Sequence, residues 1–216
     1  MCPDPLSEDE LREAWAGIPG IDAHWESLNG KGVLGRARTA DLLKSDRRLA
    51  LAAARKIEHP WYRCQALSSV AEASPATPET VSLLEEAFDA AYVQGEPNRV
   101  ASVARWPLRL MVNVDQTRAA KHTSRLLVVI AHEPHGLRRL DGLCAILVAV
   151  ASVESLRAAV LDAFLETAKV SFGWRTERLV DTAACALHPF DRMAVQALLA
   201  SRPATRYTKR SRLLPS

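Results

Sequence analysis

The stretch GKGVLGRA, residues 30–37, is the first part of the sequence whose residue types suggest chemistry. Its glycines at positions 30 and 35 are five residues apart, as in a loop that binds phosphate. Such a loop continues with lysine and then serine or threonine, whereas Arg36 and Ala37 stand here and no strand is predicted before them. We therefore interpret the stretch as a basic loop.

The stretch HEPH places His132, Glu133 and His135 together, and His59 lies in a similar stretch earlier in the chain. A metal site needs three or four converging ligands, and these stretches contain no cysteine. Histidines that cap helix ends are the simpler interpretation. Ser/His/Asp and Cys/His triads cannot be assembled from the spacing of the six histidines, so the sequence predicts no catalytic residue, metal or cofactor and favours a protein that is not an enzyme.

Composition favours helices over strands. The chain has 216 residues, of which 48% are hydrophobic, 25% are charged and only 9 are glycine. The longest apolar run, residues 142–153, is too short to span a bilayer. The acidic N-terminus does not have the order of a secretory signal, and four widely spaced cysteines are typical of thiols in a reducing compartment. We expect a cytoplasmic, all-α protein without a membrane segment.

Charge is unevenly distributed although the net charge is only +3. Residues 1–30 hold seven acidic side chains against Arg12 alone. Residues 201–216 hold five basic side chains and no acid: Arg202, Arg206, Lys209, Arg210 and Arg212. We expect this tail to be solvated and disordered, with nucleic acid or an acidic partner as the alternative.

Apolar side chains at helical spacing predict a series of short helices. Their approximate ranges are 7–16, 21–28, 46–57, 60–73, 78–94, 97–112, 115–131, 137–150, 155–170, 175–187 and 191–200. Pro107 lies inside one of them and predicts a kink or an early stop. Residues 31–48 are basic and less regular, and no helix is assigned there.

An arginine recurs near the start of alternate helices. Arg63, Arg99, Arg139 and Arg178 are separated by 36, 40 and 39 residues. In the first three copies a small residue follows at the third position and apolar residues follow at the fourth and seventh. The small residue would let neighbouring helices approach closely, and the arginine would contact a carboxylate or the carbonyls that end the preceding helix.

This pattern resembles the second helix of HEAT-like repeats over about residues 46–200. Tetratricopeptide repeats are the nearest rival, but their period is shorter and their first-helix signature is missing. The resemblance implies a short right-handed α-solenoid of about four stacked hairpins. Residues 1–45 would form an N-terminal helical cap, 46–200 the repeat array and 201–216 the tail. The fourth copy departs from the pattern, because Asp181, Thr182 and Cys185 follow its arginine.

Asp181 and three tryptophans are the remaining candidates for a site. Asp181 replaces the small residue of the other copies, so it is either a perturbed carboxylate at a packing surface or the partner of Arg178 or Arg175. Trp61 and Trp174 stand at loop edges and Trp106 on an apolar stripe, where each can anchor a partner or fill a hairpin end.

HEAT-like arrays generally serve as scaffolds, so the resemblance implies a non-catalytic bacterial adaptor that binds a protein partner. The alternative is a HEAT-like nucleic-acid-binding protein or DNA glycosylase, whose concave face carries tryptophan, aspartate and arginine. A third reading is a sensor or regulatory piece that works beside an enzyme. The candidate binding residues are Trp61, Arg63, Arg99, Trp106, Arg139, Trp174, Arg178 and Asp181.

Overall fold

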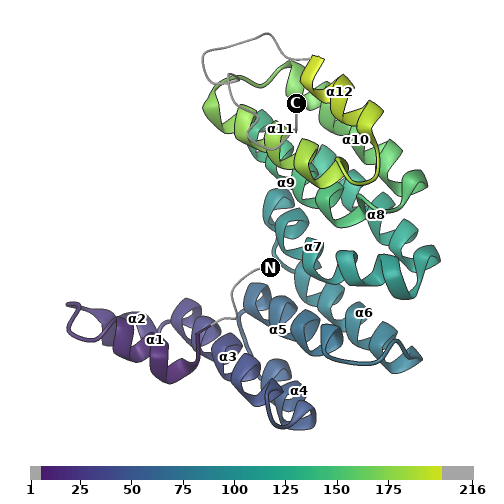
Figure 1. Ribbon diagram of the computed structural model, residues 1–216. Helices are drawn as coiled ribbons and strands as arrows, with labels where there is room; N and C mark the ends of the chain where they lie inside the picture. The colour runs from purple at the N-terminus through teal and green to yellow at the C-terminus, as the bar shows by residue number, and fades with distance from the viewer. Residues whose placement is uncertain (1–5, 201–216) are drawn as a thin grey trace. The chain divides into compact units, whose positions relative to one another are not determined.

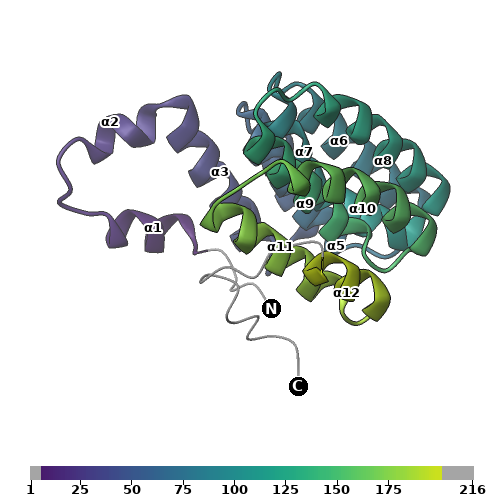
Figure 2. The same ribbon diagram turned by 90° about the horizontal axis from the view of Figure 1, so that it is seen from above.

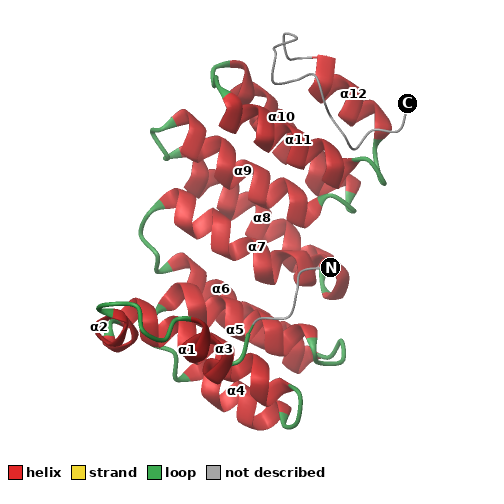
Figure 3. Ribbon diagram, turned by 60° about the vertical axis from the view of Figure 1, so that its left-hand side comes forward, coloured by secondary structure: helices red, strands yellow, loops and turns green. Residues whose placement is uncertain are grey.

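In the computed structural model, which describes residues 6–200, every regular element is an α-helix (Figure 3). The all-α prediction is therefore confirmed for this range, whereas the predicted tail at 201–216 lies outside it. The helices divide into two compact units between Gln94 and Gly95. The predicted domain boundary at residue 45 stays a prediction.

The first unit contains six helices in its described part. They are α1 (Glu8–Ala14), α2 (Ile21–Glu26), α3 (Leu28–Leu43), α4 (Arg47–Arg55), α5 (Pro60–Glu72) and α6 (Pro78–Tyr92). Helix α3 packs on α4 and α5, and α5 packs on α6. Helices α1 and α2 lie on the side of α3 that faces away from α5 (Figures 1 and 2). Leu67, Leu84 and Phe88 are fully buried in the core of this unit.

The second unit contains another six helices in its described part. They are α7 (Pro97–Val114), α8 (Gln116–Ala131), α9 (Gly136–Val150), α10 (Glu154–Lys169), α11 (Trp174–Leu187) and α12 (Arg192–Ala200). Each odd-numbered helix packs on the helix that follows it, and α9 also packs on both α7 and α11. Its core includes Leu108, Met111, Leu126, Ile130, Leu140 and Phe164.

The basic loop expected at residues 30–37 is wrong, because the stretch lies inside α3. Ser27 is the cap residue between α2 and α3. Its Oγ donates to His24 O in α2, and it accepts from Gly30 N in α3 at 3.0 Å. The expected end of the second helix at NGKG is therefore also wrong. Arg36 donates to Gln65 Oε1 at 3.0 Å, so this side chain joins α3 to α5.

The glycines of α3 serve helix packing. A Cβ atom on Gly30 would lie 2.0 Å from His24 O, and one on Gly32 would lie 2.3 Å from Tyr62 Cδ2. A Cβ on Gly35 would lie 2.8 Å from Ile57 Cγ1. The spacing that resembles a phosphate loop therefore reflects three close approaches to α3.

Pro107 does not end α7, so the early stop is wrong. The helix continues seven residues further, to Val114. A proline inside a helix costs about 3 kcal/mol. Packing of Pro107 and of the flanking Ala104, Leu108 and Met111, all of them buried, offsets that cost.

One arginine contact recurs at three helix starts, and it confirms the predicted contact to carbonyls at the end of the preceding helix. Arg63 Nη1 donates to Ile57 O at 3.2 Å, and Arg139 Nε donates to Glu133 O at 2.8 Å. Arg157 Nη1 donates to Ala151 O at 2.8 Å. In each case the arginine is the fourth residue of its helix and the acceptor lies six residues earlier.

Arg99 and Arg178 do not share that position. Arg99 is the third residue of α7, is exposed and lies 3.8 Å from the carboxylate of Glu96. Arg178 is the fifth residue of α11 and is exposed. Relative to the fourth position, Arg99 stands one residue closer to the start of its helix and Arg178 one residue further from it. Arg157 makes the contact to a carbonyl, although the sequence pattern did not include its helix.

The small residue three places after the arginine has the predicted role in α9. A Cβ on Gly142 would lie 2.5 Å from Ile130 Cδ1 and 3.1 Å from Ala101 Cβ, so α7 and α8 both approach this glycine closely. Ala66 is likewise buried in α5. Ser102 is only partly buried, in keeping with the shifted register of α7.

We predict that Arg157→Met lowers the free energy of unfolding by about 2–4 kcal/mol. Arg157 is buried, and its Nη2 also pairs with Asp191 Oδ2 at 3.2 Å, so its loss removes the donor to the Ala151 carbonyl and the cation beside Asp191. Urea denaturation measures the change. The exposed Arg47→Met on α4 is the control, with a change within about 0.5 kcal/mol; equal losses in both variants would contradict the prediction.

We predict that Gly142→Ala destabilises the protein by about 1–3 kcal/mol, although alanine is ordinarily the better helix former. The cause is the clash with Ile130 Cδ1. Because valine lacks that atom, Ile130→Val should cost less in the Gly142→Ala background than in the wild type. A double-mutant cycle measures this coupling, and additive losses would show that the contact is not the cause.

Candidate functional site

A polar stripe on α7 is the most developed candidate site in the second unit. Its side chains are Ser102, Arg105, Trp106 and Arg109, which follow one another at helical spacing. The Trp106 ring, which is partly exposed, has two cations close to it: the Arg105 Cζ is 5.7 Å from the ring centroid and the Arg109 Cζ is 5.5 Å from it. Both distances suit a cation–π contact.

Asp141 on α9 completes this surface, which we call the α7 stripe. Its carboxylate lies close to Ser102, whose hydroxyl donates to Asn98 Oδ1 at 3.3 Å, and faces the charge of Arg105. Partial burial nevertheless raises the pKa of Asp141 above its ordinary value, and the contacts with Arg105 and Ser102 oppose that change. The fold therefore holds this carboxylate where its ionised form is disfavoured, which is more common at functional sites than elsewhere.

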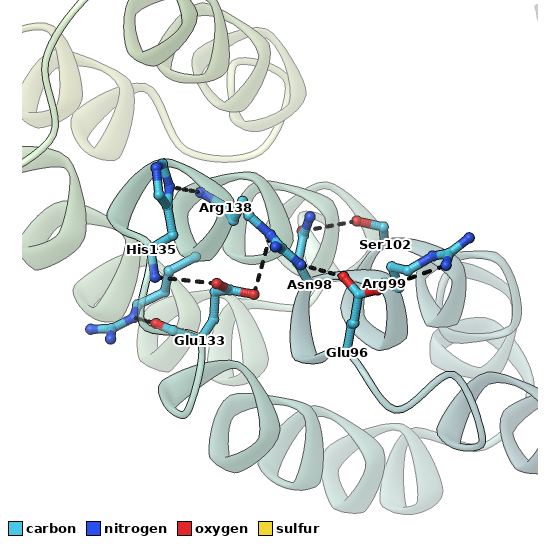
Figure 4. A network of polar contacts seen from close by, with 8 residues as sticks. Glu96, Asn98, Arg99, Ser102, Glu133, His135 and Arg138 are labelled. Carbon is cyan, nitrogen blue, oxygen red and sulfur yellow. Dashed lines mark hydrogen bonds and ion pairs between the residues drawn. The ribbon is translucent and has the colours of Figure 1, made fainter.

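A network of ion pairs borders the stripe where α7 and α9 begin (Figure 4). Arg138 on α9 bridges Glu96, the residue before α7, and the buried carboxylate of Glu133. Glu133 also accepts from the backbone N–H of His135 at 3.2 Å. The buried charge of Glu133 is thus paired and hydrogen-bonded, as a stable interior requires, and the network fixes α9 against α7.

The histidines of HEPH lie where the capping interpretation predicts. His132 ends α8, and its Nδ1 donates to Val128 O at 2.8 Å. His135 precedes α9, and its Nδ1 accepts from Arg138 N at 3.4 Å. His59 also precedes a helix, but it packs edge-on against Tyr62 without a side-chain cap.

The two cysteines of the second unit, Cys144 and Cys185, are not suited to act as nucleophiles. Burial raises the pKa of Cys144 to about 12, and the nearby Asp141 adds to the increase. Burial and the charge of Asp181 raise the pKa of Cys185 as well. Both thiols therefore stay protonated at neutral pH, whereas a cysteine nucleophile requires the thiolate.

The other predicted site residues are distributed over both units. Trp61 and Arg63 lie on α5 in the first unit, where both are partly buried. Trp174, Arg178 and Asp181 lie on α11 in the second, with Trp174 exposed beneath the guanidinium of Arg175 at 5.4 Å. Arg99 belongs to the network of Figure 4, and Arg139 holds the α8–α9 connection.

Only Trp106 of the predicted residues lies in the α7 stripe. Sequence reasoning missed Arg105, Arg109 and Asp141, although the first two have a detectable signal: they stand one residue before and three residues after a tryptophan in a helix. Asp141 has no such signal, because only the packing of α9 on α7 places it beside Ser102.

The arrangement defines a helical protein with a mixed-charge, aromatic surface on α7 and α9. Comparison adds no family: no protein-family model matches the chain, and no curated protein or solved structure is significantly similar to it. In residues 6–200, no three His, Cys, Asp or Glu side chains are arranged to hold a metal ion. Within that range, no helix has both the length and the apolar character needed to cross a bilayer.

We predict that Asp141→Asn raises the free energy of unfolding at neutral pH. Because folding raises the pKa of Asp141, the stability linked to its protonated form is present at low pH and is lost as the pH rises through the folded-state pKa. The advantage of the amide should therefore shrink as the pH falls toward about 3.9, the pKa of an unfolded aspartate.

Urea denaturation at several pH values measures this difference. Asp162→Asn removes an exposed carboxylate on α10 and serves as the control. A stabilisation of Asp141→Asn that is the same at every pH, or that grows as the pH falls, would contradict the assignment.

Proposed function

We propose that this protein is a non-catalytic helical-repeat adaptor and that the α7 stripe binds a protein partner. The observation that carries the proposal is that the guanidinium groups of Arg105 and Arg109 both lie against the Trp106 ring, with the carboxylate of Asp141 close to Arg105. Tryptophan and arginine are the residue types that most often dominate the energy of protein interfaces.

The repeat architecture is part of this proposal. Within the second unit α7, α9 and α11 pack in succession, and each also packs on the helix that follows it. In the first unit α3 packs on α5 in the same way, and α3 and α5 also pack on α4 and α6, the helices that follow them. Stacking of hairpins through alternate helices is the packing rule of α-solenoids, and a right-handed array of HEAT-like type would place the α7 stripe on its inner layer.

The mixed charge of the stripe favours a protein over nucleic acid. Arg105 faces Asp141, and at the edge Arg138 pairs with Glu96 and Glu133. Nearby carboxylates compete with phosphates for the arginines, whereas nucleic-acid affinity comes mainly from basic charge that no carboxylate opposes. We expect carboxylates of the partner at Arg105 and Arg109, and an apolar side chain against the Trp106 ring.

We predict that Trp106→Ala and Arg109→Glu each weaken partner binding by about tenfold or more. The experiment compares quantitative affinity purification with the wild-type chain, with both variants and with Lys121→Ala, an exposed control on α8. Each protein that the stripe variants lose is then titrated against all four chains by calorimetry, and the control should retain wild-type affinity.

Two results would overturn the proposal. The first is a wild-type chain and stripe variants that capture the same proteins in equal amounts. The second is binding of a labelled DNA duplex that falls steeply with salt and disappears in Arg109→Glu, because that behaviour belongs to a nucleic-acid-binding protein.

A further inference from the structure

The first unit contains a groove between α3 and α4 whose lining is basic and apolar. Its volume is about 580 Å³, and its floor is formed by small residues of both helices. The cations at this groove are Lys31, Arg38 and Lys56, against one acid, Glu58. We call it the α3–α4 groove.

Apolar side chains of the groove are left open to solvent. Leu28 and Leu49 are 52% and 51% exposed, although both line it. Arg38 and Lys56 are also exposed, and neither makes an ion pair with another described residue. Lys31, in contrast, pairs with Glu26 at 3.4 Å. The groove therefore combines uncovered leucines with two cations, Arg38 and Lys56, that have no ion-pair partner among the described residues.

Residues 6–26, which comprise α1, α2 and their connection and which we call the N-terminal arm, have the opposite charge. The arm holds six acidic residues and one arginine, Arg12. It also exposes large apolar side chains: Leu6, Trp15 and Ile18 are 49%, 44% and 49% exposed. Trp15 is nevertheless held in place, because its ring stacks on His24 and contacts Trp25.

Helix α1 makes few contacts of its own. It has seven residues, and none of them is buried. An isolated helix of this length is unstable in water, and its capping box at Ser7 and Glu10 offsets only part of that instability. Asp9 and Glu13 lie one turn apart on this helix and are both exposed, so they present two carboxylates on one face.

We propose that the N-terminal arm of one copy of this chain docks in the α3–α4 groove of a second copy. Asp9 and Glu13 then face Arg38 and Lys56, and apolar side chains of the arm cover Leu28 and Leu49. None of the arm's residues lines the groove of its own chain, although Glu26 at the end of α2 pairs with Lys31 at its edge. This inference does not depend on the α7 stripe.

Charge reversal tests the proposal in the full chain by sedimentation velocity at low salt over a range of concentrations. We expect the wild type to self-associate, and more weakly at high salt. The groove variant Arg38→Glu with Lys56→Glu, and the arm variant Asp9→Lys with Glu13→Lys, should each weaken self-association by about tenfold or more. Lys121→Glu with Lys169→Glu reverses two exposed charges of the second unit and should leave it unchanged.

A mixture of the two variants is the decisive measurement. The two new lysines of the arm variant meet the two new glutamates of the groove variant, so the mixture should associate more strongly than either variant does alone. Circular dichroism of each variant checks that it is folded, and the restored association shows that both surfaces are intact.

Three results would overturn the proposal. A wild-type chain that stays monomeric at every concentration would assign the groove to a different occupant. Self-association that the groove variant leaves unchanged would place the contact elsewhere. Folded variants whose mixture stays monomeric would show that the arm and the groove do not meet.

Discussion

Three of the connections between helices depend on a contact between the fourth-residue arginine of a helix and the carbonyl six residues before it. Arg63, Arg139 and Arg157 each reach back over the N-cap to the end of the preceding helix. The contact joins the carbonyl end of one helix to the first turn of the next, so it sets the geometry of the connection. A cation near a helix N-terminus is electrostatically unfavourable, which shows that satisfying the carbonyl outweighs the macrodipole.

Once the connections are fixed, close approach of alternate helices forms the cores. Gly32 and Gly35 let α3 approach Tyr62 and Ile57, and Gly142 lets α9 approach α7 and α8. These glycines cost helix propensity, but a methyl group at any of them would clash with a side chain of the neighbouring segment, which would have to shift. The same approach of α9 to α7 brings Asp141 beside Ser102 and Arg105, so the α7 stripe is a consequence of the packing.

Polar groups in the second unit have two distinct roles. Glu133 is buried and is fully engaged by Arg138 and by the His135 backbone, so it stabilises the start of α9. Asp141 is held at a cost in stability, since burial raises its pKa despite two favourable contacts. Glu133 is therefore a structural carboxylate, whereas Asp141 is available to a partner. This difference supports the α7 stripe, and not the ion-pair network beside it, as the binding surface.

The sequence by itself determined the helices from Arg47 onward, because their starts and stops depend on local signals such as Pro60, Pro78 and Pro97 at first turns. It also indicated the arginine–carbonyl contact, since the donor and the acceptor are only six residues apart in the chain. Only the tertiary structure decided that residues 30–37 are helical, that α7 continues past Pro107 and that Asp141 meets Ser102. Each of these depends on contacts between residues far apart in the chain, whose energy outweighs local propensity and leaves no mark in local spacing.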